Sequence, residues 1–343
     1  MKRLAGSIAV LVTLLVPRAA AAQTIGVAGD RFTIDLEDGK GPQPKFLLFI
    51  SYFDALRATD SDGDLSYIAT TLHFDGIRVL PNWQRRLATY CPEETADRLF
   101  DASGNIRGDT SPATGPLAKL IALIETARRH KLIVDVTFTR DTVPGLSVDN
   151  YIRAVTRAAT LLRPYRNVVF DLDNEVELHG MTETDVRRLR DAIVANADPR
   201  IGDPHRIVVA SRSGDITDVA AYNKRTGMSA VAYHDPREAD WAARVPAVVA
   251  NLRAAGMPVY LQEPQAWNSG LSICGSVEGK GKDADGDANH FRTAVRNARA
   301  AGAAAWTFHT RQSFRLHAGG SLRSRIRASA TEKALLERLY STR

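Results

Sequence analysis

Eight short apolar runs, each followed by a longer amphipathic segment, repeat along the chain with no break in composition. The runs cover residues 45–53, 74–83, 132–140, 167–175, 206–214, 228–236, 258–264 and 302–310. Such runs are typical of parallel strands that are buried on both faces, and the segments between them show the three- and four-residue apolar spacing of helices. Eight strand–helix units in about 290 residues predict a closed (β/α)8 barrel.

An open, doubly wound sheet is the alternative fold for alternating strands and helices. That fold usually places a glycine-rich phosphate-binding turn after its first strand. Here the position reads SYFDALRATD, residues 51–60, which contains no glycine. The sequence therefore favours the barrel, preceded by a short β-hairpin whose turn lies near DLEDGKG, residues 35–41.

The first 22 residues have the pattern of an export signal. Lys2 and Arg3 precede the apolar run LAGSIAVLVTLLVP, and AAAAQ supplies small residues for cleavage after Ala22. The apolar run is short for a membrane span, and no stop-transfer pattern follows it, which disfavours the alternative of an N-terminal anchor. We therefore expect a signal peptide over 1–22, a single (β/α)8 domain over 23–343, and a secreted or periplasmic location.

The charge balance disfavours a nucleic-acid partner. The formal net charge is +6, and removal of the signal peptide also removes three basic residues, Lys2, Arg3 and Arg18. No long basic run is present, and no later 18-residue apolar run predicts stable insertion into a membrane. The pattern specifies no oligomeric state.

Cys91 and Cys274 are the two cysteines of the chain. In an oxidising compartment they can form one disulfide, and two separate thiols are the alternative. No CxxC pair or Cys/His spacing predicts a zinc site. The stretches DSDGD at 60–64 and DADGD at 283–287 resemble calcium loops, but both lack glycine at position six and glutamate at position twelve. We expect solvated turns there, and neither a metal nor a cofactor.

Polar side chains gather at the carboxyl ends of the predicted strands, which is where the active site of a (β/α)8 barrel lies. The fourth strand shows this most clearly, because RNVVFDLDNEVELHG places acids at Asp171, Asp173, Glu175 and Glu177. Burial of several like charges is unfavourable unless each has a partner. We expect Asp171 and Asp173 to lie deeper, with cationic or hydrogen-bonding partners, and Glu175 to reach the rim.

Glu175 and Glu263 each end an apolar strand, the fourth and the seventh. Strands on opposite sides of a narrow barrel can direct long side chains to a common point above its axis. Two carboxyl groups about 5–5.5 Å apart suit glycoside hydrolysis with retention of configuration. One carboxyl donates a proton to the leaving oxygen, and the other attacks the anomeric carbon.

Four motifs together resemble the clan A retaining glycoside hydrolases, which include cellulases and β-glycosidases. They are DNE on the fourth strand, VYLQEP on the seventh, GIRVLPNW on the second and AAAWTFH on the eighth. The resemblance covers essentially the whole chain after residue 22. It implies that Glu175 is the acid/base, that Glu263 is the nucleophile, that Asn174 binds the sugar 2-hydroxyl and that Arg78 keeps Glu263 ionised.

The same resemblance implies further contacts with the sugar. His234 matches a polar aromatic position on the sixth strand, where Tyr233 is the alternative inward residue, and Trp306 matches a platform beneath the sugar. Trp83 and Trp267 are candidates for sugar stacking or for loop anchors. The full set of expected substrate-binding residues is Arg78, Asn82, Trp83, Asn174, His234, Trp267 and Trp306. Because consecutive strand residues face opposite ways, we expect a bend or bulge at Asn174 and Glu175.

These features predict a secreted retaining glycoside hydrolase that cleaves an oligo- or polysaccharide by double displacement. Two alternatives remain open at this stage. One is a barrel that binds carbohydrate without cleaving it. The other is an inverting glycosidase, in which Asp171, Asp173 or Glu177 acts as the base.

Overall fold

The computed structural model describes residues 23–82, 98–107, 115–140, 143–195, 206–235, 240–267, 288–314, 316, 320–339 and 341. Its centre is a set of eight parallel strands, namely β4 (Leu47–Ser51), β5 (Gly76–Val79), β6 (Ile133–Thr137), β7 (Val168–Asp171), β8 (Ile207–Val209), β9 (Val231–His234), β10 (Val259–Glu263) and β12 (Ala305–Thr310). Their order is β8-β7-β6-β5-β4-β12-β10-β9. The two ends of this path meet where Arg212, just after β8, bridges Tyr233 of β9. The predicted (β/α)8 barrel is therefore confirmed as a nearly closed cylinder.

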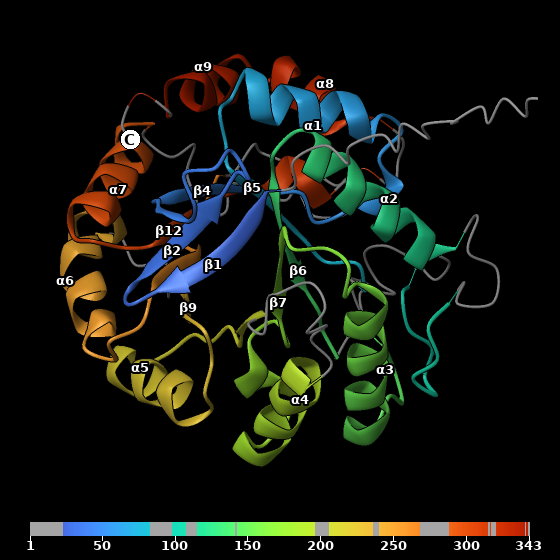
Figure 1. The fold of residues 1–343 in the computed structure, drawn as a ribbon. Helices are drawn as coiled ribbons and strands as arrows, with labels where there is room; N and C mark the ends of the chain where they lie inside the picture. The colour runs from blue at the N-terminus through green and yellow to red at the C-terminus, as the bar shows by residue number, and fades with distance from the viewer. Residues whose placement is uncertain are drawn as a thin grey trace, which may run out of the picture.

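A ring of helices surrounds the strands (Figure 1). They are α1 (Ser61–Thr70), α2 (Pro116–Arg129), α3 (Val148–Leu161), α4 (Glu183–Ala195), α5 (Ile216–Arg225), α6 (Trp241–Arg253), α7 (Ala288–Ala300), α8 (Leu322–Ala328) and α9 (Ala330–Leu339). Short 3-10 turns lie at η1 (Ala55–Arg57), η2 (Val176–Leu178) and η4 (Arg311–Phe314), and the two-residue strand β11 (Ala266–Trp267) pairs with β12.

The N-terminal hairpin closes the bottom of the barrel. Strands β1 (Thr24–Ala28) and β2 (Arg31–Asp35) pair antiparallel, and β3 (Gln43–Pro44) extends this small sheet. Phe32 is fully buried and packs edge-on against Tyr260 of β10, with 6.3 Å between ring centroids. The backbone N–H of Ile25 also donates to the carbonyl of Arg166, just before β7. The hairpin thus fills the amino-terminal end and leaves the carboxyl end for a site (Figure 1).

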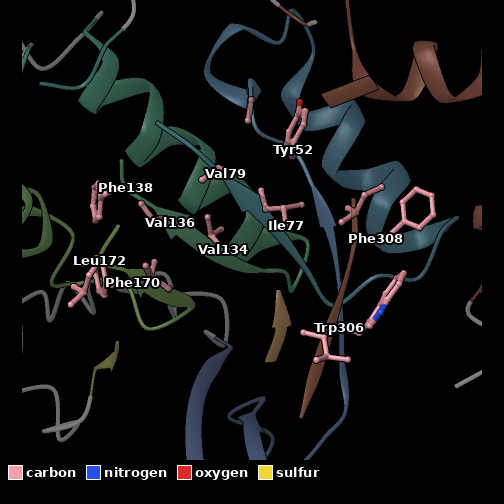
Figure 2. Packing of buried hydrophobic residues seen from close by; sticks show 14 of the residues in the cluster. Tyr52, Ile77, Val79, Val134, Val136, Phe138, Phe170, Leu172, Trp306 and Phe308 are labelled. Carbon is pink, nitrogen blue, oxygen red and sulfur yellow. The ribbon is translucent and has the colours of Figure 1, made fainter. Parts of the chain in front are cut away.

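Two apolar layers hold the barrel together. An inner layer contains Phe49, Ile133 and Tyr260, whereas a larger outer layer packs the barrel against its helices. Figure 2 shows part of the outer layer, with Ile77, Val134 and Trp306 among its labelled residues. Alternate strand residues divide between the two layers, which is the period-two pattern of a strand. This division decides which polar side chains reach the interior.

Residues 60–64, expected as a solvated turn, instead begin α1. Asp60 is the N-cap, because its side chain accepts a hydrogen bond from the backbone N–H of Gly63. Asp64, in the first turn of α1, is fully buried. The prediction of a solvated turn at 60–64 was therefore wrong, because an Asx-type N-cap starts a helix there.

Several predictions fall outside the described residues, namely the signal peptide over 1–22, Trp83, the pair Cys91 and Cys274, and the DADGD stretch at 283–287. Within the described ranges, every helix is too short or too polar to cross a membrane.

Candidate active site

The four acids that follow β7 have four different environments. Asp171 points into the barrel and is fully buried. Asp173 is buried on the side of α3, where it accepts from the backbone N–H of Arg140 (3.0 Å) and lies 3.0 Å from Nδ1 of His179. Glu177 accepts from the N–H and the hydroxyl of Ser213, at 2.8 and 2.6 Å. Glu175 is the acid that remains at the mouth of the barrel.

The chain turns sharply at Glu175. Strand β7 ends at Asp171, four residues earlier than predicted, and Glu175 adopts a left-handed conformation with φ 56° and ψ 63°. This region is uncommon for residues other than glycine, and it concentrates at functional sites. The backbone N–H of Asn174 donates to the carbonyl of Phe138, and that of Glu175 donates to the Ser211 hydroxyl. The predicted irregularity is confirmed, and it brings both side chains to the same side.

Arg78 of β5 connects the two sides of the site. Its guanidinium is fully buried and donates to Oε2 of Glu263 (2.7 Å), to Oδ1 of Asn174 (2.8 Å) and to the hydroxyl of Thr137 (3.0 Å). A buried arginine that donates to a carboxylate holds its charge and its orientation. Arg78 also lies 3.7 Å from Asp171, so neutralising that acid and positioning Glu263 are not exclusive roles.

A register shift in β10 turns two consecutive residues inward. The pairing of β10 with β9 slips between Leu261 and Glu263. As a result, Gln262 donates to Asp135 and Asp171 inside the barrel, while Glu263 reaches Arg78 above them. The side chain of Glu263 is 15% exposed, against 30% for Glu175. Of the two carboxylates, Glu263 is the more enclosed and the more firmly held.

His234 faces the site, and Tyr233 does not. Tyr233 belongs to the outer apolar layer, and its hydroxyl donates to the carbonyl of Gly214. Nδ1 of His234 lies 3.5 Å from Oε1 of Glu175 and 3.8 Å from Oε2 of Glu263. Burial opposes a charge on His234, but Glu263 and Glu175 outweigh it and raise the pKa of His234 above its ordinary value.

The same imidazole limits the separation of the two glutamates. Because Nδ1 of His234 contacts both, Oε1 of Glu175 and Oε2 of Glu263 are at most about 7.3 Å apart, the sum of the two distances. This upper limit is below the largest separation, about 9.5 Å, between the two carboxyl groups of glycosidases.

His309 is a site residue to which the sequence assigned no role. Its Nδ1 lies 3.4 Å from Oε1 of Glu263, and its ring packs against Phe53 and Phe314, with centroids 5.1 and 5.5 Å away. The alternation of residues along β12 could have identified His309 from the sequence. Ala305, Thr307 and His309 alternate with larger apolar residues, and this alternation places all three on the inner face.

Trp306 lies on the opposite face of β12 from the site. It is fully buried in the outer layer, with its ring centroid 6.3 Å from that of Phe308 (Figure 2). A sugar platform at Trp306, as the resemblance implied, does not fit this placement. The physical reason is the strand period, because inward His309 requires Trp306 to point outward.

Two further expected substrate contacts serve as loop anchors. Trp267 is 2% exposed and packs edge-on against Phe291 of α7, with centroids 5.3 Å apart. Asn82 is fully buried, donates to the carbonyl of Thr139 and accepts from the backbone N–H of Phe100. Neither placement fits the substrate-binding role predicted for these residues. Among the predicted site residues that the structure describes, Arg78, Asn174, Glu175, His234 and Glu263 come together.

Comparisons with known proteins extend the picture of the fold. No family model and no curated protein sequence matches the chain. Solved structures do match. A glycoside hydrolase superposes with a TM-score of 0.59 at 12% identity, over 86% of this chain and 66% of the other, so this chain spans about two thirds of that protein.

Two further structures match over nearly their full length. An endocellulase from Pyrococcus horikoshii in complex with cellotetraose has a TM-score of 0.57 at 13% identity, over 93% of this chain and 100% of that one. A glycoside hydrolase family 5 enzyme from Prevotella bryantii, in complex with a xyloglucan tetradecasaccharide, has a TM-score of 0.58 at 13% identity, over 87% and 96% of the two chains. At these identities the likeness establishes a shared fold.

Proposed function

We propose that the protein is a retaining glycoside hydrolase of the clan A type, acting on an oligo- or polysaccharide. The observation that carries this proposal is that Glu175, after β7, and Glu263, at the end of β10, both contact the imidazole of His234. Glycoside hydrolases among the structures of the same fold add support. In this scheme Glu263 attacks the anomeric carbon while Glu175 donates a proton to the leaving oxygen. Water, activated by Glu175, then releases the sugar from Glu263.

The environments of the two glutamates suit these different roles. Glu263 accepts a short hydrogen bond from a buried guanidinium, which favours its ionised form as the nucleophile. Glu175 is more exposed and stands beside His234, at the point where a leaving group and water would arrive. Asn174, held by Arg78, is in a position to bind the sugar 2-hydroxyl.

The surroundings of the other acids favour retention over inversion. An inverting enzyme needs a second carboxylate that activates water opposite the leaving group. Asp171 and Asp173 are fully buried, and Glu177 is bonded to Ser213. Burial of Asp171 and Asp173 and the bonding of Glu177 to Ser213 argue against these three acids as the base and favour Glu263 as the partner of Glu175.

The test compares two glutamate variants with a neighbouring control on a panel of aryl β-glycosides, cello-oligosaccharides and xyloglucan. Glu175→Gln is expected to lower kcat/KM by about 10²–10⁴-fold for substrates that need protonation. Glu263→Gln is expected to lower it by on the order of 10³-fold or more. Glu177→Gln makes the same change two residues from the acid and should keep activity within about threefold.

Proton NMR of the first-formed anomer tests the stereochemistry separately. Retention is expected, and an inverted first product would overturn the double-displacement scheme. Wild-type protein that cleaves nothing on the panel would contradict the enzyme proposal itself. We also propose export, with cleavage after Ala22, which predicts Gln23 as the first residue of protein recovered from outside the cell.

A further inference from the structure

Two buried carboxyl groups lie side by side beneath Arg78. Asp135 of β6 and Asp171 of β7 occupy adjacent strands, and both are fully buried. Nε2 of Gln262 donates to Oδ2 of Asp135 (2.7 Å) and to Oδ2 of Asp171 (3.0 Å). One amide group therefore bridges the two acids, and its Oε1 lies 3.1 Å from Nε2 of His234.

The charges of this cluster do not balance if every acid is ionised. Arg78 lies 3.8 Å from Asp135, 3.7 Å from Asp171 and 2.7 Å from Glu263. A single guanidinium would then face three anions inside the barrel. Two neighbouring carboxylates in a water-poor interior cannot both hold their charge easily, and such pairs retain a proton. The hydrogen bonds indicate which acid retains it.

Asp135 is the better stabilised anion of the two. It accepts from the hydroxyls of Tyr260 (2.8 Å) and Thr137 (3.1 Å) in addition to Gln262. Asp171 accepts from Gln262 and from the backbone N–H of Ser211 (3.0 Å). Donors favour the charged form of a carboxyl, so the additional donor places the negative charge on Asp135.

We propose that Asp135 and Asp171 share a single proton, carried by Asp171, and that this proton sets the charge beneath Arg78. Asp171 is then a positioning residue for the Arg78–Glu263 pair. While Asp171 is neutral, Arg78 is balanced by Asp135 and remains available to Glu263. Loss of the proton to solvent places a second anion 3.7 Å from Arg78, in competition with Glu263.

Other groups around the pair add to this balance. The titratable and charged ones are Arg78 of β5, Tyr151 of α3, His234 of β9, and Tyr260 and Glu263 of β10. Burial, and next the charge of Asp135, raise the pKa of Asp171 to about 7. The proton would therefore be lost within the ordinary working range of an enzyme.

The direct test measures protonation without any substrate. Infrared difference spectra between pH about 5 and 9 should show loss of one buried carboxylic-acid C=O band near pH 7 when the reference protein and every variant also carry Glu332→Gln. That background is needed because burial raises the pKa of Glu332 to about 7 as well. That band should be absent in Asp171→Asn, which resembles the protonated acid in shape and charge. In Asp135→Asn the neighbouring anion is gone, so the band should disappear at lower pH. Asp173→Asn, the control, should retain the wild-type behaviour.

Two further measurements separate a positioning role from a purely structural one. NMR titration of His234 should give a lower pKa in Asp171→Asn than in the wild type, because the anion that forms at Asp171 above pH about 7 in the wild type cannot form in the variant. The pH profile of kcat/KM for Asp171→Asn is the second measurement, and it rests on the proposed function. It should match the wild-type profile within about twofold on the acidic limb and depart from it only above pH about 7. A uniform loss at all pH values would overturn the proposal.

The spectroscopic result stands apart from the enzyme assay. A wild type that cleaves no substrate, together with a Glu332→Gln reference protein that shows the carboxylic-acid band, would contradict the proposed function alone. A wild type that cleaves glycosides, together with a Glu332→Gln reference protein that shows no such band, would overturn the shared proton alone. If Asp171→Asn does not fold, the shift of the band in Asp135→Asn decides the same question.

Discussion

Arg78 is the side chain on which most of the candidate site depends. It is fully buried and donates to a carboxylate, an amide oxygen and a hydroxyl from three different strands or strand ends. A lysine would retain the charge, but it offers a single nitrogen in place of the planar fork. The geometry therefore makes Arg78→Lys a severe change at this position.

Arg78→Lys is expected to lower kcat/KM by on the order of 10²-fold and the free energy of unfolding by about 2–4 kcal/mol, because hydrogen bonds to charged buried groups are lost. Initial rates and urea unfolding measure the two effects. Arg212→Lys, just after β8, is the matched control. Unchanged kinetics in Arg78→Lys would show that Arg78 does not orient Glu263.

The site residues predicted from the sequence differ in whether a short local motif was enough to identify them. Arg78, Asn174, Glu175 and Glu263 were identified from motifs at strand ends, and the structure brings them together. Trp306 was assigned by resemblance, and its outward direction depends on the register of the whole strand. Asn82 and Trp267 were expected to bind substrate, with a loop anchor as the alternative for Trp267, and both are buried anchors in the structure.

At the scale of elements, one carboxylate of α1 holds the start of α8. Asp64 accepts from the backbone N–H groups of Leu322 (2.7 Å) and Arg323 (2.8 Å), and from the hydroxyl of Tyr52 (2.6 Å). The first N–H groups of a helix have no partner within the helix, and an acid there also interacts favourably with the helix dipole. Asp64 thus acts as a cap supplied from 258 residues away in the chain.

Asp64→Ala is expected to lower the free energy of unfolding by about 3 kcal/mol, because it leaves buried donors without their acceptor. Urea unfolding followed by circular dichroism measures this change. Asp62→Ala, on the exposed side of the same helix, should change stability by less than about 0.5 kcal/mol. Equal effects of the two substitutions would refute the capping role.

Element boundaries were also where the sequence was least informative. The alternation of apolar runs and helices predicted each barrel strand, yet β7 ends at Asp171 and not at Glu175. The turn that follows is fixed by hydrogen bonds from Asn174 to Phe138 and from Glu175 to Ser211, which come from neighbouring strands. Such tertiary contacts leave no local pattern in the sequence.

At the scale of the whole molecule, the barrel carries several buried acids whose protons the native state retains. Burial raises the pKa of Glu332, on α9, to about 7, although the hydroxyl of Thr310 and the amide of Gln312 donate to it. Burial, with the charge of Asp135, does the same for Asp171. In the unfolded chain these acids release their protons near pH 4. The native state therefore binds more protons than the unfolded state between these values.

This difference fixes the sign of the pH dependence. Stability contributed by an acid with a raised native pKa is fully present below the unfolded value, and it is lost as pH rises through the native value. His234, whose native pKa is also raised, loses its contribution in the same direction. The free energy of unfolding of the wild type should consequently decrease from pH about 5 to about 8, by at most about 1.4 kcal/mol per pH unit for each proton.

Glu332→Gln isolates one of these protons. Glutamine stays neutral at every pH, so the variant should lose about 1–3 kcal/mol less stability than the wild type over this range. Urea unfolding at several pH values gives the two slopes. Glu337→Gln, on the exposed face of the same helix and paired with Lys333, should keep the wild-type slope. Parallel slopes for the wild type and Glu332→Gln would mean that Glu332 is already ionised in the native barrel, against the burial that isolates it from water.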